Sequence, residues 1–139
     1  MTSVSIYNAL NAGIWSKLSG GTALITALGG TAIYPGQAPD DINPPYVVWS
    51  YQFGGPDNMT PRESTQQVIY IRAYANTEAQ AGTIDALISD LLHKGTITAS
   101  GWNSFWVARE TEFAFPEVDE AKVITWTAGA YYRVRMDQT

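Results

Sequence analysis

The 139-residue chain has no cysteine, one histidine and only eight lysine and arginine residues. Without cysteine there can be no disulfide, thiolate metal site or cysteine nucleophile, so packing alone must hold the fold. The net charge of −5 disfavours specific or nonspecific nucleic-acid binding, which relies on basic side chains at the phosphates. No apolar run approaches the roughly 18 residues of a membrane span, and the N-terminus lacks a secretory signal pattern. We therefore expect a protein that is made in the cytoplasm and binds no membrane.

Catalytic motifs are also missing. His93 is the sole histidine, and no nucleophile-elbow pattern accompanies it, so a structural role is the favoured reading. The paired glycines match neither a phosphate loop nor a dinucleotide fingerprint. Glu110 and Glu112 share a strand face at period two, as a glycosidase pair would, but exposed carboxylates at this spacing are common. The acidic stretch from Glu110 to Glu120 fits a solvated loop better than an oxygen-ligand metal site. We expect no enzyme activity, no cofactor and no bound metal.

The residues that are present indicate one compact domain spanning 1–139. Apolar residues make up 45% of the chain and charged residues 15%, which argues against disorder. Periodicity predicts a first helix at about 5–18, capped by Ser3 or Ser5, then helical turns at 22–28. Strands are expected at 47–53, 66–75, 96–99, 105–113 and 121–136, with Gly129 as a bulge or bend. The order predicts an α+β fold, an antiparallel β-sheet with helices packed on one face.

The most secure element is a helix that begins at Thr77. Thr77 and Gln80 have the form of a capping box, and Gly95 offers a left-handed cap at the other end. Asp85 and Ser89 are expected to point outward. The predicted core stripe consists of Ile84, Leu87, Ile88, Leu91 and Leu92.

The connection between the first two long strands is the first candidate for an interaction site. It contains glycine, proline, aspartate and asparagine, which break a strand and bury little apolar area. At about a dozen residues it is longer than a hairpin needs, and such loops are often functional. The candidate residues are Gly54, Gly55, Pro56, Asp57, Asn58, Met59, Thr60, Pro61 and Arg62.

Aromatic residues supply the rival hypothesis. Rings can stack on sugars, so a carbohydrate-binding module is an alternative from a different functional class. Most of the aromatic residues, however, fall on alternating strand positions, and one face of each strand must belong to the core. This pattern favours a role in core packing or in a protein interface. The tryptophans concerned are Trp15, Trp49, Trp102, Trp106 and Trp126.

Three segments together resemble a known family: Ile33-Tyr34-Pro35-Gly36, Pro45-Tyr46-Val47-Val48, and Val68 to Ala75 followed by Thr77-Glu78-Ala79. Their order and their residues are similar to those of the tail-completion proteins of long-tailed bacteriophages, the tail terminator or tail-to-head joining family. The resemblance implies a structural virion protein that forms a ring, typically of six, on the tail tube. Such a ring stops tube growth and docks to the head connector or neck protein. A related neck or head-completion component is the near alternative.

Overall fold

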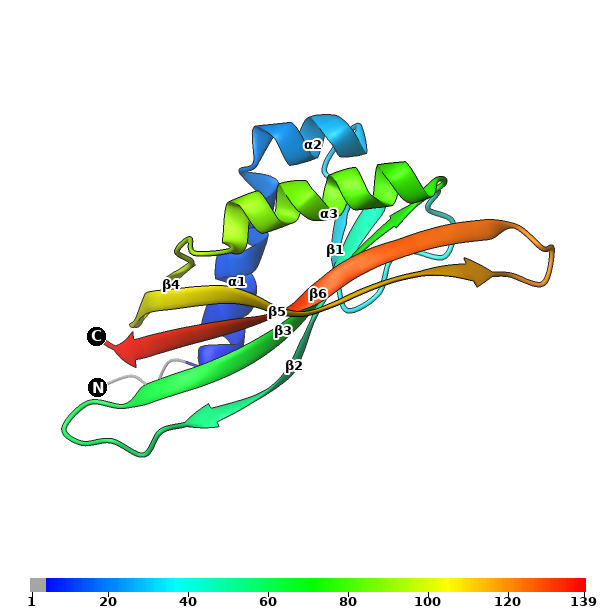
Figure 1. The fold of residues 1–139 in the computed structure, drawn as a ribbon. Helices are drawn as coiled ribbons and strands as arrows, with labels where there is room; N and C mark the ends of the chain where they lie inside the picture. Colours follow the sequence, from blue (N-terminus) through cyan, green and yellow to red (C-terminus); the bar gives the residue numbers. More distant parts are fainter. Residues whose placement is uncertain (1–4) are drawn as a thin grey trace.

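The computed structural model describes residues 5–139, which form a six-stranded sheet and three helices (Figure 1). The elements in chain order are α1 (Ile6–Ser19), α2 (Thr22–Leu28), β1 (Ile33–Pro35), β2 (Tyr46–Pro56), β3 (Ser64–Ala75), α3 (Glu78–Leu92), β4 (Thr98–Ala99), β5 (Trp102–Val118) and β6 (Ile124–Gln138).

The sheet is mixed, in the order β1-β2-β3-β6-β5-β4. Four of its neighbouring pairs are antiparallel, as predicted, but β1 runs parallel to β2. β1 was not among the strands expected from the sequence. Ile33 is buried, and the proline-rich segment after β1 loops back so that β2 follows the same direction. Pro35 is the last residue of β1 and the other prolines of the segment follow it, so the amide hydrogens that prolines lack are missing only from the end of the pairing.

One face of the sheet carries the core. Alternate residues of the central strand β3 point toward the helices, and apolar residues of α1 and α3 cover them (Figure 1). The fully buried members at this junction are Leu10, Ile14, Leu18, Ile69, Ile71, Ile84, Ile88 and Leu92. We refer to the opposite face, which presents Tyr70, Arg72 and Tyr74, as the open face.

The helix ends follow the predicted chemistry with two differences. Ser5 caps α1 by accepting from the Asn8 amide at 3.3 Å, whereas Ser3 lies outside the described residues. Thr77 accepts from the Gln80 amide at 3.1 Å, but the Gln80 side chain accepts from the Asn76 amide at 3.2 Å instead of completing the box at Thr77. At the C-terminus the left-handed residue is Lys94, with a φ of 60°, and not Gly95.

The core face of α3 is rotated slightly from the predicted stripe. Ile84, Ile88 and Leu92 are buried, while Leu87 and Leu91 are only half-buried. Asp85 does not point outward as expected, because its carboxylate binds Arg109 of β5. Helical periodicity alone did not predict the orientation of Asp85, because its partner is an arginine that lies far away in the sequence.

The two long C-terminal strands pair along their whole length and extend past the rest of the sheet (Figure 1). β5 is longer than the predicted 105–113, whereas β6 is shifted towards the C-terminus from the predicted 121–136. The irregularities lie in β5, at Phe105 and at Glu110-Thr111, and the prediction of a bulge at Gly129 was wrong. Gly129 is regular but crowded, since a Cβ there would collide with the carbonyl oxygen of Ile71 on β3. Within residues 5–139, no helix is long and apolar enough to cross a membrane.

Candidate interaction surfaces

The predicted interaction loop is the end of a long hairpin. β2 continues through Gly54, Gly55 and Pro56, so these residues do not break the strand as expected. An extra residue, Gln52, bulges β2 and lets the pairing with β3 resume. The remaining candidates, Asp57, Asn58, Met59, Thr60, Pro61 and Arg62, form the exposed turn.

The turn has its own hydrogen bonds. The Asp57 amide donates to the Ser64 carbonyl at 2.7 Å, and the Met59 amide donates to the Glu63 carboxylate at 3.2 Å. The Met59 side chain is nevertheless 56% exposed, with no core to cover it. An ordered turn that presents an apolar side chain to solvent is suited to contact another protein.

A buried polar cluster anchors this hairpin, and sequence reasoning missed it. Gln67 is 2% exposed, accepts from the Tyr51 hydroxyl and donates to the Thr65 hydroxyl at 2.6 Å. Thr65 in turn donates to the Gly55 carbonyl at 3.0 Å. The only sequence signal was a polar residue, Gln67, on the core side of an otherwise apolar alternation. These hydrogen bonds link Tyr51 and Gly55 of β2 to Gln67 and Thr65 of β3, and so hold the two strands of the hairpin together.

A second arm projects from the other end of the sheet, where β5 and β6 join (Figure 1). Its turn is closed by Asp119, whose side chain accepts from the Val123 amide at 2.9 Å, and by Lys122 at a φ of 62°. Val118 and Val123 are 62% and 57% exposed. We call residues 117–124 the arm tip. It combines apolar side chains with three carboxylates, those of Glu117, Asp119 and Glu120.

The other acidic residues of this region serve ion pairs. The bulge in β5 separates Glu110 from Glu112, contrary to the expected shared face: Glu110 accepts from Arg133 at 3.0 Å and Glu112 from Arg109 at 2.8 Å. Within residues 5–139, no group of three or more His, Asp or Glu residues is arranged to hold a metal ion.

Arg109 ties α3 to the sheet. Its guanidinium donates to both Asp85 oxygens, at 2.9 and 2.6 Å, and to the Tyr132 hydroxyl at 2.8 Å. Burial acts to lower the pKa of Arg109, but hydrogen bonds to Asp85 and Glu112 outweigh it and raise that pKa above its usual value. Arg109 therefore stays charged, and its contacts with Asp85 and Tyr132 join α3 to the sheet.

His93 lies at the end of α3. Its Nδ1 atom accepts a hydrogen bond from the Arg109 amide at 3.0 Å, which joins the helix end to β5. Next to it is a groove of about 450 Å³ at the edge of the sheet, lined by His93, Lys94, Gly95, Phe105, Trp106, Val107 and Ala108. Phe105 and Trp106 are 47% and 41% exposed there.

The open face holds a row of aromatic rings that sequence reasoning did not assemble. Tyr70 stacks on Tyr131 with ring centroids 4.8 Å apart, and Tyr46 stacks on Tyr74 at 4.9 Å. The Arg72 guanidinium lies between them, 4.8 Å from the Tyr70 centroid. The period-two pattern of Tyr70, Arg72 and Tyr74 was the available signal. The five tryptophans, in contrast, are spread over four elements, and among the described residues only Trp15 and Trp49 stack on each other, at 6.2 Å.

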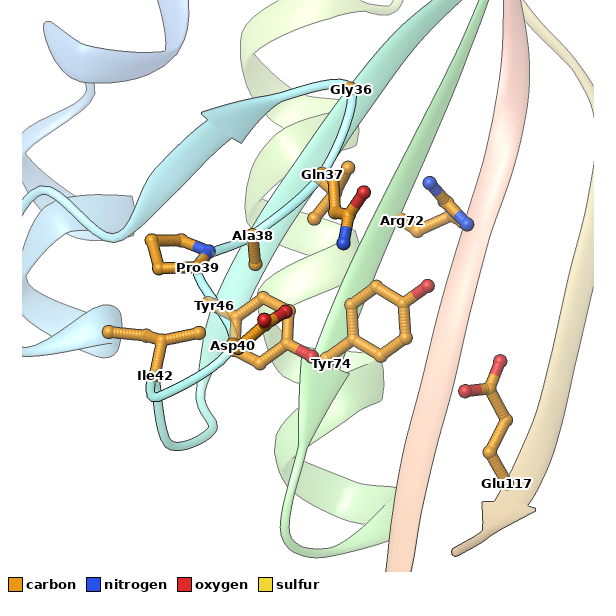
Figure 2. Close-up of a pocket in the computed structure, with 11 residues that line it drawn as sticks. Gly36, Gln37, Ala38, Pro39, Asp40, Ile42, Tyr46, Arg72, Tyr74 and Glu117 are labelled. Atoms are coloured by element: carbon orange, nitrogen blue, oxygen red, sulfur yellow. The ribbon is translucent and has the colours of Figure 1, made fainter.

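The Arg72 side chain also lines a cleft of about 420 Å³ between β2, β3 and the loop after β1 (Figure 2). Its Nε atom is buried without a hydrogen-bond partner among the described residues. Gln37, Asp40 and Glu117 carry polar groups into the same cleft (Figure 2). Burial raises the pKa of Tyr46 and Tyr74, so their hydroxyls remain neutral near pH 7. The cleft is polar and open, and it contains no paired acid and base placed for catalysis.

Comparison with known proteins decides what kind of protein carries these surfaces. The family of tail completion protein gp17 matches residues 13–136, which is nearly the whole chain. The chain belongs to this family. Members of this family are structural parts of phage tails. This tail completion protein is therefore a component of the virion, and its family is not an enzyme family.

Solved structures show the same fold. A chain from the virion of a native gene transfer agent particle aligns with a TM-score of 0.74 at 19% identity, over 97% of this tail completion protein and 99% of its own length. A second solved protein aligns with a TM-score of 0.55 at 11% identity, over 95% and 94% of the two chains. No protein among the curated sequences matches the chain.

Proposed function

We propose that this tail completion protein closes the head-proximal end of the tail tube as a ring of six copies and supplies the surface that joins the tail to the head connector. The observation that carries the proposal is the family match over residues 13–136. The fold supports it, because one end of the sheet presents the ordered β2–β3 turn and the other end presents the β5–β6 arm. A ring subunit needs two different patches for its neighbours and a further surface for the tube or connector, and a sheet with distinct ends can supply them.

The β2–β3 turn is the contact that we assign to the tail tube or the connector. It is ordered by its own hydrogen bonds, it is held by the polar cluster around Gln67, and it exposes Met59. The proposal therefore requires the turn for assembly but not for folding.

The experiment supplies the protein to tail tubes in a phage that lacks its own completion protein. With the protein, tubes of uniform length should form and join heads; without it, tubes should be overlong and headless in negative-stain images. A wild-type protein that folds but neither limits tube length nor restores joining would refute the proposal.

The turn is tested in the same assay by replacing Asp57 to Pro61 with a short Gly-Ser linker. This change should leave the melting temperature nearly unchanged, because the replaced side chains are exposed. It should reduce the yield of joined particles. A matched control replaces the exposed helix residue Asp90 with Ala. If the shortened protein joins tails at the wild-type yield, the turn has no contact role.

A further inference from the structure

We infer that the arm tip of one subunit docks in the groove beside Trp106 of the next subunit, so that both ends of β5 form the contact between copies. The inference rests on the proposed ring and deepens it by naming the two patches. Each patch is an unsatisfied surface in the monomer. The arm tip exposes Val118, Val123 and Ile124, and the groove exposes Phe105 and Trp106.

Charge complementarity identifies a second copy as the occupant of the groove. The arm tip has Glu117, Asp119 and Glu120 against one basic residue, Lys122. The groove is lined by Lys94 and His93 and by no carboxylate. The opposite charges beside the two apolar patches attract each other, and copies docked in the wrong register would place like charges together.

Arg135 does not line the groove, but it lies beside Phe105, which does. Its guanidinium carbon lies 5.6 Å from the centre of the Phe105 ring, and its Nε atom is buried without a partner among the described residues. In the same residues, the ion pairs of 4 Å or less use Arg109 and Arg133 and leave Arg135 unpaired. A carboxylate brought in by a neighbour would give this arginine an acceptor.

The two patches cannot satisfy each other within one chain. Trp106 and Val118 lie on the same strand, and at about 3.3 Å per residue they are roughly 40 Å apart. Any contact between them must therefore join different copies. A contact between two unlike patches is heterologous, and such contacts repeat from head to tail until a ring closes.

The absence of native cysteine allows a direct test. A variant with both Val118→Cys and Trp106→Cys should form, under mild oxidation, a ladder of disulfide-linked multimers on a non-reducing gel. Each single variant should remain monomeric, because its one thiol has no partner of the other kind. Both replaced side chains are exposed, so the variants are expected to fold.

A control pair keeps Val118→Cys but places the second thiol at Asp90→Cys, on the exposed side of α3. It should form no ladder. Ladders from the control pair at equal yield, or strong dimers from Val118→Cys alone, would overturn the assigned contact. An absent ladder in the two-site variant, with folding confirmed by circular dichroism, would overturn it as well.

A charge exchange supplies a second readout. Lys94→Glu or Glu120→Lys alone should weaken self-association by about tenfold, and the two changes together in one chain should restore it. Failure of the inference and failure of the proposed function are distinguishable. If the wild type closes tubes but the two-site variant gives no ladder, the contact is wrong and the function stands; a ladder from a protein that does not close tubes gives the opposite result.

Discussion

Asp85 and Arg109 form the strongest single link between α3 and the sheet. The side chains are 16% and 12% exposed, and the two hydrogen bonds between them are 2.9 and 2.6 Å long. Removing one partner of such a pair leaves the other charge without compensation. Asp85→Ala should therefore lower the free energy of unfolding by about 2 to 4 kcal/mol, somewhat reduced because Glu112 and Tyr132 still bind Arg109.

Urea denaturation measures the change, with Asp90→Ala as the matched control on the exposed side of the same helix. The control should change stability by less than about 0.5 kcal/mol. Equal losses for the two variants would show that the ion pair adds nothing beyond helix propensity.

Gly129 gives a prediction of a different kind. A Cβ at this position would collide with the Ile71 carbonyl oxygen and come within 2.7 Å of the Phe113 ring. Gly129→Ala should thus destabilise the sheet by about 1 to 3 kcal/mol. Gly82→Ala is the control, because no atom lies within 4 Å of its added Cβ and helix propensity favours alanine by up to about 1 kcal/mol. Opposite shifts in melting temperature are expected, and two shifts of the same sign would contradict the packing argument.

At the scale of elements, α3 separates side chains that complete the core from those at its margin. Ile84 and Ile88 are buried, whereas Leu87 is half-buried. Ile88→Ala should cost about 2 to 5 kcal/mol by leaving a cavity under the sheet. Leu87→Ala should cost clearly less, because solvent already reaches that side chain. Chemical denaturation of the two variants measures the difference; a larger loss for Leu87 would place the core face on the other side of the helix.

The elements also show what the sequence could and could not predict. Local signals, such as Thr77 with Gln80 or the alternation in β3, predicted α1, α3 and the long strands. The errors came from distant partners. The sequence did not indicate that Ile33 would pair with Val47 in a parallel strand, or that Asp85 would turn inward to bind Arg109. The candidate turn was located correctly, but its first three residues belong to β2, since a bulge at Gln52 lets the strand continue. No local pattern specifies which strands meet.

At the scale of the whole molecule, the proposed contact surfaces lie at the two ends of one twisted sheet, with the helical core between them (Figure 1). β3, β5 and β6 run from one end to the other. A continuous sheet of this kind holds the Trp106 groove and the arm tip at a fixed separation, as the contact that we propose between copies requires. Single contacts near the lower end of the roughly 1,200 to 2,000 Å² range can be weak alone and stable once the ring is complete.

The same architecture predicts a protein without catalytic activity. Carboxylates are the groups to test for acid-base chemistry, since the chain has no cysteine and its one histidine accepts a hydrogen bond from the Arg109 amide. Glu110 and Glu112 are the fair test, although each holds an arginine. Purified protein should release no reducing sugar from bacterial cell-wall or surface polysaccharide. Glu110→Gln and Glu112→Gln should leave tail completion intact, because the two carboxylates are 36% and 66% exposed and ion pairs of exposed groups contribute about 0 to 1 kcal/mol. Reproducible sugar release that either substitution abolishes would identify an enzyme and overturn the structural interpretation.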